Sequence, residues 1–128
     1  ALTLLEEAER LVGHGRDVAA LIGIRDVKAS ALAARGDVEA ALALARQNER
    51  AYRELGDTEF VINVLCFQTD LLVEQAGRPR EGIPLAEEAC RLAAEHPQSH
   101  LLERAHACLE RARFRGKPWW KRLLQRRP

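Results

Sequence analysis

The sequence contains little of what sheets, membrane spans and disulfide frameworks require. Aromatic residues make up only 5% of its 128 residues, and it has five Pro and eight Gly. This scarcity, beside abundant Ala, Leu, Glu and Arg, favours helices and disfavours strands. With 47% hydrophobic residues, the chain can still bury a sizeable core. We therefore expect an all-α protein without a sheet.

No apolar run approaches the roughly 18 residues that a membrane-spanning helix needs, and residues 1–7 lack the basic flank of a signal peptide. The three cysteines, Cys66, Cys90 and Cys108, are too few and too far apart for a disulfide framework or a zinc knuckle. These absences predict a cytoplasmic protein whose cysteines serve as small apolar residues near helix interfaces.

Motifs of catalysis and cofactor binding are also missing. The sequence has no glycine-rich nucleotide-binding pattern, no H-E-x-x-H and no nucleophile elbow. His100, Glu103 and His106 follow one another at steps of three, so on a helix their side chains diverge by about 60° per step. They could hardly all bind one ion. We expect no catalytic residue, no metal site and no cofactor.

The charges are distributed unevenly along the chain. Residues 111–128 hold eight of the 20 basic side chains and no acidic one. The other 12 basic side chains share residues 1–110 with all 19 acidic side chains. An acidic body is therefore followed by a strongly basic tail.

What the sequence does contain is an internal repeat of 41 residues. Three expected N-caps, Asp17, Thr58 and Ser99, are separated by this interval. The same interval separates Gly36 and Gly77, which we expect to end helices in the left-handed conformation. Between these signals, apolar residues recur at helical spacing. The pattern predicts about seven helices, near residues 1–13, 17–35, 38–55, 58–75, 79–95, 99–115 and 118–126.

Each 41-residue unit is predicted to be a helical hairpin. Asp37 is suited to cap its second helix and Gly56 to end it, while Pro79 is suited to the first turn of the corresponding helix 41 residues later. Residues 1–13 match such a second helix, so the chain starts in the middle of a repeat. We therefore expect it to be a piece of a longer protein or an array whose first half-repeat is lost.

The segments 36–45 and 77–89 resemble the turn and second helix of a tetratricopeptide repeat, with a Gly and later small residues at the family's positions. The unit is longer than that family's usual one and is similar to repeats in bacterial regulatory and signalling proteins. The resemblance implies a right-handed superhelical array of antiparallel hairpins over residues 1–116. It also implies a protein-interaction scaffold or sensor module that binds a peptide or a neighbouring domain on a concave wall. Gly82 stands where the family usually has Ala.

Polar residues of the predicted helix 58–75 form one stripe, facing away from the core: Glu59, Asn63, Cys66, Asp70 and Glu74. The residues 41 positions later are His100, Arg104, Ala107, Arg111 and Arg115. Because equivalent helices of a repeat array lie side by side, we expect Asp70 near Arg111, Glu74 near Arg115 and Glu59 near His100.

These contacts have two interpretations that can both hold. They are ion pairs between repeats, each of small energy, or they present donors and acceptors to a protein or peptide partner. We assign six residues to a partner-binding wall: Arg25, Asn63, Cys66, Asp70, Arg104 and Arg111.

Residues 117–128 are predicted to form a basic amphipathic capping helix or tail, opened by Pro118. One face would carry Trp119, Trp120, Leu123 and Leu124, and the other Lys121, Arg122, Gln125 and Arg126. The helix could cap the array against residues 99–115, bind an anionic membrane surface, bind nucleic acid, or dock on another protein or a second copy. The candidate site residues of the tail are Trp119, Trp120, Lys121 and Arg122.

Overall fold

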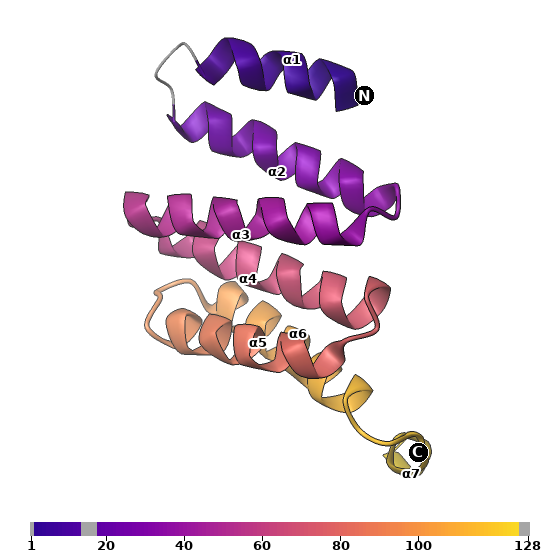
Figure 1. Ribbon diagram of the computed structural model, residues 1–128. Coiled ribbons are helices and arrows are strands. Elements are labelled where there is room, and N and C mark those ends of the chain that lie inside the picture. Colours follow the sequence, from indigo (N-terminus) through magenta and orange to yellow (C-terminus); the bar gives the residue numbers. More distant parts are fainter. Residues whose placement is uncertain (1, 14–17, 126–128) are drawn as a thin grey trace. The chain divides into compact units, whose positions relative to one another are not determined.

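The computed structural model describes residues 2–13 and 18–125, which form helices and turns and contain no strand (Figure 1). The all-α prediction is confirmed, and the expected cap at Asp17 lies outside the described residues. The chain divides into two compact units, Ala1–Gly56 and Asp57–Pro128. The helices are α1 (Leu2–Gly13), α2 (Val18–Ala34), α3 (Val38–Leu55), α4 (Thr58–Asp70), the π-helix η1 (Leu71–Gln75), α5 (Pro79–Ala94), α6 (Ser99–Arg115) and α7 (Trp119–Gln125).

In the first unit, α2 packs against both α1 and α3. Gly36, with φ of 89°, closes α2 in the left-handed conformation, as predicted, so that α3 returns antiparallel to α2. Small and branched apolar side chains meet between the two helices: Ile22, Ala29 and Ala33 of α2, and Ala41, Leu42 and Ala45 of α3.

A polar cluster that the 41-residue pattern does not contain links α2 to α3. Asn48 Nδ2 donates to Asp26 Oδ1 at 2.8 Å, and the hydroxyl of Tyr52 donates to the other carboxylate oxygen of Asp26. Asn48 is fully buried and Tyr52 nearly so. Because a buried amide that loses its partner costs free energy, the cluster favours one alignment of the two helices.

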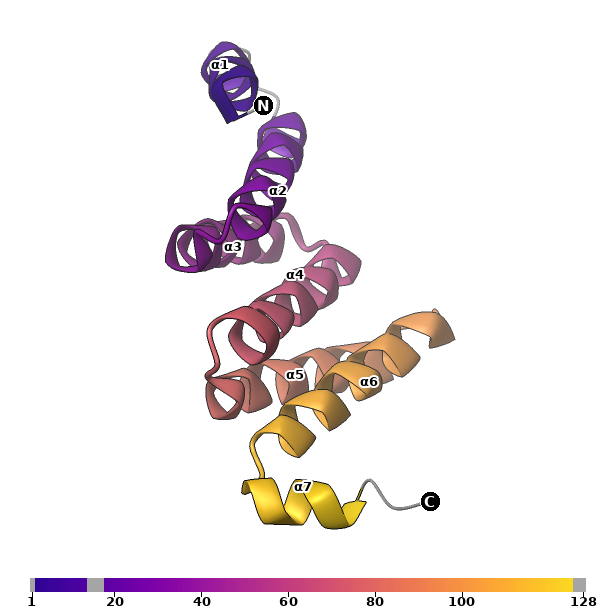
Figure 2. The same ribbon diagram turned by 90° about the vertical axis from the view of Figure 1, so that its right-hand side faces the viewer.

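In the second unit, α4, α5 and α6 contact one another (Figure 2). Short turns make α5 antiparallel to both of the others. The core is built from Val61, Ile62 and Leu65 of α4, Leu72 of η1, Ala86, Ala89 and Ala93 of α5, and Leu101, Ala105 and Ala112 of α6. These side chains follow the helical spacing that the sequence predicted.

The helix starts at Thr58 and Ser99 are confirmed, but the two expected N-caps are off by one residue, because the caps are Asp57 and Gln98. For α4 the reason lies in the preceding turn: Gly56 ends α3 at φ of 72°, and the Asp57 carboxylate lies 3.4 Å from the amide nitrogen of Phe60. The Gln98 side chain makes no cap hydrogen bond. Asp37 is the cap of α3, as predicted, and Pro79 opens α5.

The predicted helix 58–75 is not a uniform α-helix. It widens into the π-helix η1, where the amide of Ala76 donates to the Leu71 carbonyl at 2.9 Å and that of Arg78 to the Leu72 carbonyl at 2.8 Å. Leu71, Leu72 and Val73 are all buried, which the wider turn of a π-helix accommodates more easily than an α-helix does. Gly77, at φ of 66°, then reverses the chain, as predicted.

Helices α4 and α5 lie close together at Gly82. A Cβ atom at this position would lie 3.1 Å from Thr69 Cγ2 and 3.5 Å from the Thr69 carbonyl oxygen. Thr69 is fully buried, and its hydroxyl donates to the Leu65 carbonyl at 2.8 Å, which holds the side chain in place. There is therefore no room at Gly82 for a branched or long side chain.

We predict that Gly82→Leu lowers the free energy of unfolding by at least about 2 kcal/mol, because the side chain must separate α4 from α5. The matched control is Gly23→Leu in α2, where a Cβ would meet no described atom within 4 Å. Relief of the low helix propensity of Gly should leave that variant as stable as the parent or up to about 1 kcal/mol more stable. Urea unfolding followed by far-ultraviolet circular dichroism measures both. Equal stability of the two variants would contradict the close contact.

Candidate partner-binding surface

Three pairs of polar side chains join α4 and η1 to α6, each pair 41 residues apart. Arg104 Nη1 donates to Asn63 Oδ1 at 2.7 Å, Arg111 Nη2 lies 2.9 Å from Asp70 Oδ1, and Arg115 Nη1 lies 3.7 Å from Glu74 Oε2. Since the offset is constant along three levels, the two helices run parallel in a single register. We call these six residues the α4–α6 row.

The row confirms two of the three expected contacts, Asp70 with Arg111 and Glu74 with Arg115, and adds the pair Asn63–Arg104. Within the part of the chain described here, Glu59 and His100 form no ion pair or hydrogen bond. Arg25, also assigned to the wall, is half-buried on α2, in the first of the two units.

Cys66 does not belong to an exposed wall. Only 1% of its surface is exposed, and Cys108 of α6 is equally buried beside it. Cys108 Sγ lies 3.7 Å from the Cys66 carbonyl oxygen and 3.7 Å from Asp70 Oδ1. The helical stripe that contains Asn63 and Asp70 also contains Cys66, but the approach of α6 covers the middle of that stripe.

The two buried thiols are free cysteines. A hydrogen bond with Cys108 and burial together raise the pKa of Cys66 well above its ordinary value. Because the thiolate is the reactive form of cysteine, the raised pKa makes Cys66 a poor nucleophile. The hydrogen bond with Cys66 lowers the pKa of Cys108, but its burial keeps reactants away from the thiol. The pair instead allows close packing: Ala105 and Ala112, one turn before and one turn after Cys108, are fully buried as well.

The charged members of the row remain accessible. The side chains of Arg111 and Asp70 are 52% and 41% exposed, and those of Arg115 and Glu74 are 43% and 48% exposed. Partial burial alone would lower the pKa of Arg111, but the Asp70 carboxylate outweighs it, and the net pKa is raised. Exposed ion pairs of this kind contribute only about 0–1 kcal/mol each. They align the helices more than they stabilise them.

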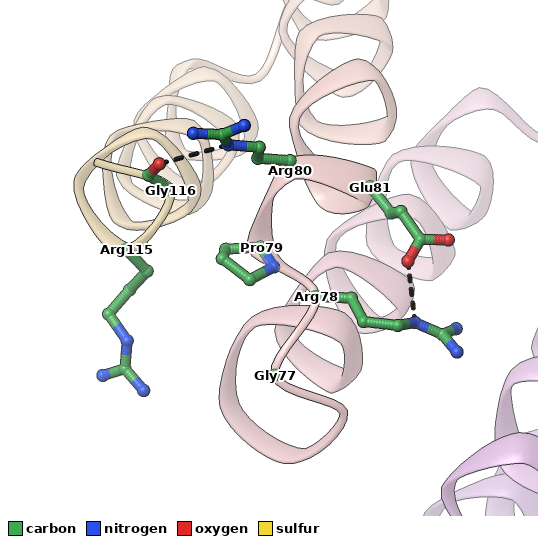
Figure 3. Close-up of a pocket in the computed structure, with 7 residues that line it drawn as sticks. All are labelled: Gly77, Arg78, Pro79, Arg80, Glu81, Arg115 and Gly116. Carbon is green, nitrogen blue, oxygen red and sulfur yellow. Dashed lines mark hydrogen bonds and ion pairs between the residues drawn. The ribbon is translucent and has the colours of Figure 1, made fainter. Parts of the chain in front are cut away.

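A cavity of about 290 Å³ lies where the start of α5 meets the end of α6 (Figure 3). Sequence reasoning missed it because its lining comes from two distant segments, 77–81 and 115–116. Arg80 Nε donates to the Gly116 carbonyl at 3.4 Å, and Arg78 Nε pairs with Glu81 at 2.8 Å. Figure 3 shows the guanidinium groups of Arg78, Arg80 and Arg115 pointing in different directions. The three cations therefore do not converge on one ligand.

The tail helix α7 forms where the sequence predicted it, but it does not cap the second unit. Trp119 is 67% exposed, Trp120 49%, Leu123 55% and Leu124 58%, and no residue of α7 is buried. Figures 1 and 2 show α7 beyond the C-terminal end of α6, clear of α4. The turn through Gly116 and Pro118 directs the helix outward instead of back along α6.

Two further possibilities were tested on the described residues. No group of three or more His, Cys, Asp or Glu side chains is placed to hold a metal ion. No helix among residues 2–13 and 18–125 is both long and apolar enough to cross a bilayer.

We predict that a thiol reagent such as DTNB labels Cys90 in the native chain, whereas Cys66 and Cys108 react only after unfolding. Cys90 is half-buried and its pKa is raised mainly by burial, so its labelling rate should still increase with pH above the range of an ordinary thiol. Cys90→Ser should abolish the native phase and keep the two thiols that appear in denaturant. Rapid native labelling of Cys66 would show that α4 and α6 are not packed as described.

Comparisons with known proteins add no assignment to this surface. No family model, no curated protein and no solved structure matches the chain. The α4–α6 row and the exposed helix α7 are therefore the two candidate sites of the second unit.

Proposed function

We propose that the chain is a protein-interaction module that binds a peptide or helical segment of a partner along the α4–α6 row. The observation that carries this proposal is the line of exposed, in-register polar pairs between two parallel helices. A guanidinium group has five N–H donors and a carboxylate has about four acceptor positions. One contact within each pair leaves most of them available to a second molecule.

The spacing of the row indicates what kind of segment fits it. Arg104 and Arg111 are seven residues apart on α6, which is about 10.5 Å, or roughly two turns, along the helix. A partner helix with acidic residues at i and i+7 would meet both guanidinium groups from one face. A basic residue beside the second acidic one would meet Asp70, which lies at the level of Arg111. The preferred ligand is therefore a helix of alternating charge, and not a uniformly charged strand.

The sequence resemblance supports the same proposal. If the 41-residue units stack as tetratricopeptide repeats do, the row belongs to the concave wall of a right-handed superhelical array. In that setting, a cytoplasmic role in a larger bacterial regulatory protein follows from the resemblance. The absence of a catalytic motif from the sequence favours a binding module over an enzyme.

Selection from a displayed library of helical peptides against the whole chain tests the proposal. Peptides with acidic residues at i and i+7 and a basic residue that meets Asp70 should be enriched, and Asp70→Arg or Arg104→Glu should weaken their binding by about tenfold or more in Kd, close to 1.4 kcal/mol. Glu103→Arg is the matched control for Asp70→Arg: it makes the same change of charge on α6 but points about 100° away from Arg104.

The affinity for the peptide should depend on where the charge is changed and not on the net charge of the chain. If Asp70→Arg and Glu103→Arg weaken binding equally, the effect is one of net charge and the row is not the binding surface. If the selected peptides bind the Asp70→Arg and Arg104→Glu variants as tightly as the parent chain, the proposal fails.

A further inference from the structure

The four apolar side chains of α7 form one continuous exposed face. At about 100° per residue, Trp119, Trp120, Leu123 and Leu124 fall within an arc of roughly 140°. All four are at least 49% exposed. Exposed apolar faces of this kind mark contacts with other molecules, because water is a poor solvent for indole and isobutyl groups.

The opposite face and the flanks of α7 are basic. Lys121 and Arg122 lie on the far side of the helix, and Lys121 Nζ is 5.3 Å from the centre of the Trp120 ring. No acidic residue follows Glu110 in the sequence, while eight basic residues do. Three of the eight, Arg111, Arg113 and Arg115, pair with acidic residues of the second unit. The other described basic residues of this segment, Lys117, Lys121 and Arg122, lie on α7 or in the turn before it and give this end of the unit a positive charge.

We propose that α7 binds the surface of an anionic lipid bilayer, lying in the plane of the headgroups. Trp119, Trp120, Leu123 and Leu124 enter the boundary between headgroups and acyl chains, while Lys121, Arg122 and the flanking basic residues contact lipid phosphates. Amphipathic helices with aromatic and leucine side chains on one face and basic residues on the other bind membranes in this manner.

Charge and apolar surface together favour lipid over nucleic acid and over a second copy of α7 as the ligand of this helix. A nucleic acid would use the positive charge but would leave the apolar face in water. A second α7 would cover the apolar face but would bring two strongly basic segments together. Of these three, the anionic bilayer is the one that satisfies both faces at once.

The proposed binding is reversible and needs both the apolar face of α7 and its basic residues. One short amphipathic helix buries little apolar surface, so attraction to anionic lipid must supplement it, and salt should weaken the binding. The proposal goes beyond the peptide-binding function, because the α4–α6 row and α7 use different residues. A module with both surfaces could bring a bound partner to a membrane.

Both tryptophans of the chain lie on α7, so tryptophan emission reports on this helix alone. With vesicles that contain phosphatidylserine, the whole chain should sediment with the lipid and its emission should shift to shorter wavelength. Brominated acyl chains should quench that emission. Vesicles of phosphatidylcholine alone, or high salt, should abolish most of the binding.

Paired variants separate the contributions of the two faces. Leu123→Ser with Leu124→Ser keeps both tryptophans and every charge, and should weaken partition into anionic vesicles by about tenfold or more. Its control is Leu4→Ser with Leu55→Ser, which alters two exposed leucines outside α7 and should leave partition unchanged. Lys121→Glu with Arg122→Glu should also reduce binding.

Three outcomes would overturn the proposal. The first is no spectral shift and no sedimentation with anionic vesicles at low salt. The second is a blue shift that depends on protein concentration without lipid, which would indicate self-association. The third is salt-dependent binding to DNA or RNA together with vesicle binding that the Leu123→Ser, Leu124→Ser variant leaves unchanged.

Discussion

The packing of small side chains between α4, α5 and α6 determines where the side chains of the α4–α6 row lie. Gly82 allows α5 to approach Thr69, and Cys66 and Cys108 allow α6 to approach α4. These side chains are buried. Their size nevertheless sets the distance at which Arg104 and Arg111 meet Asn63 and Asp70, so the row depends on residues that are buried beneath it.

Two kinds of contact act at the same helix interface. The buried apolar side chains supply most of the stability, since burial of apolar surface is the dominant favourable term in folding. The exposed polar pairs contribute little energy each but penalise any sliding of α6 along α4, because a shifted register would separate Asp70 from Arg111. Stability and alignment are thus provided by different residues.

The sequence repeat predicted part of this arrangement. An interval of 41 residues was sufficient to place Asp70 opposite Arg111 and Glu74 opposite Arg115, because equivalent helices that pack in parallel keep their offset. It could not show that Cys66 is buried, since periodicity gives the direction of a side chain but not the distance of the neighbouring helix. The Asp26–Asn48–Tyr52 cluster was missed because it does not recur at that interval. The cap proposed for α7 was wrong because an apolar face does not specify which neighbour covers it.

The π-helix η1 determines which changes of chain length the surface can tolerate. Packing between the helices holds the row in place. Residues added in the turn 95–98 would therefore lengthen the 41-residue interval without moving Arg104 and Arg111 away from Asn63 and Asp70. A one-residue deletion within 71–73 would instead tighten the wide turn and rotate Glu74 by about 100° relative to Asp70. Insertions in the loop 95–98 between α5 and α6 are thus compatible with the row. The number of residues between Asp70 and Glu74, in contrast, is fixed by η1.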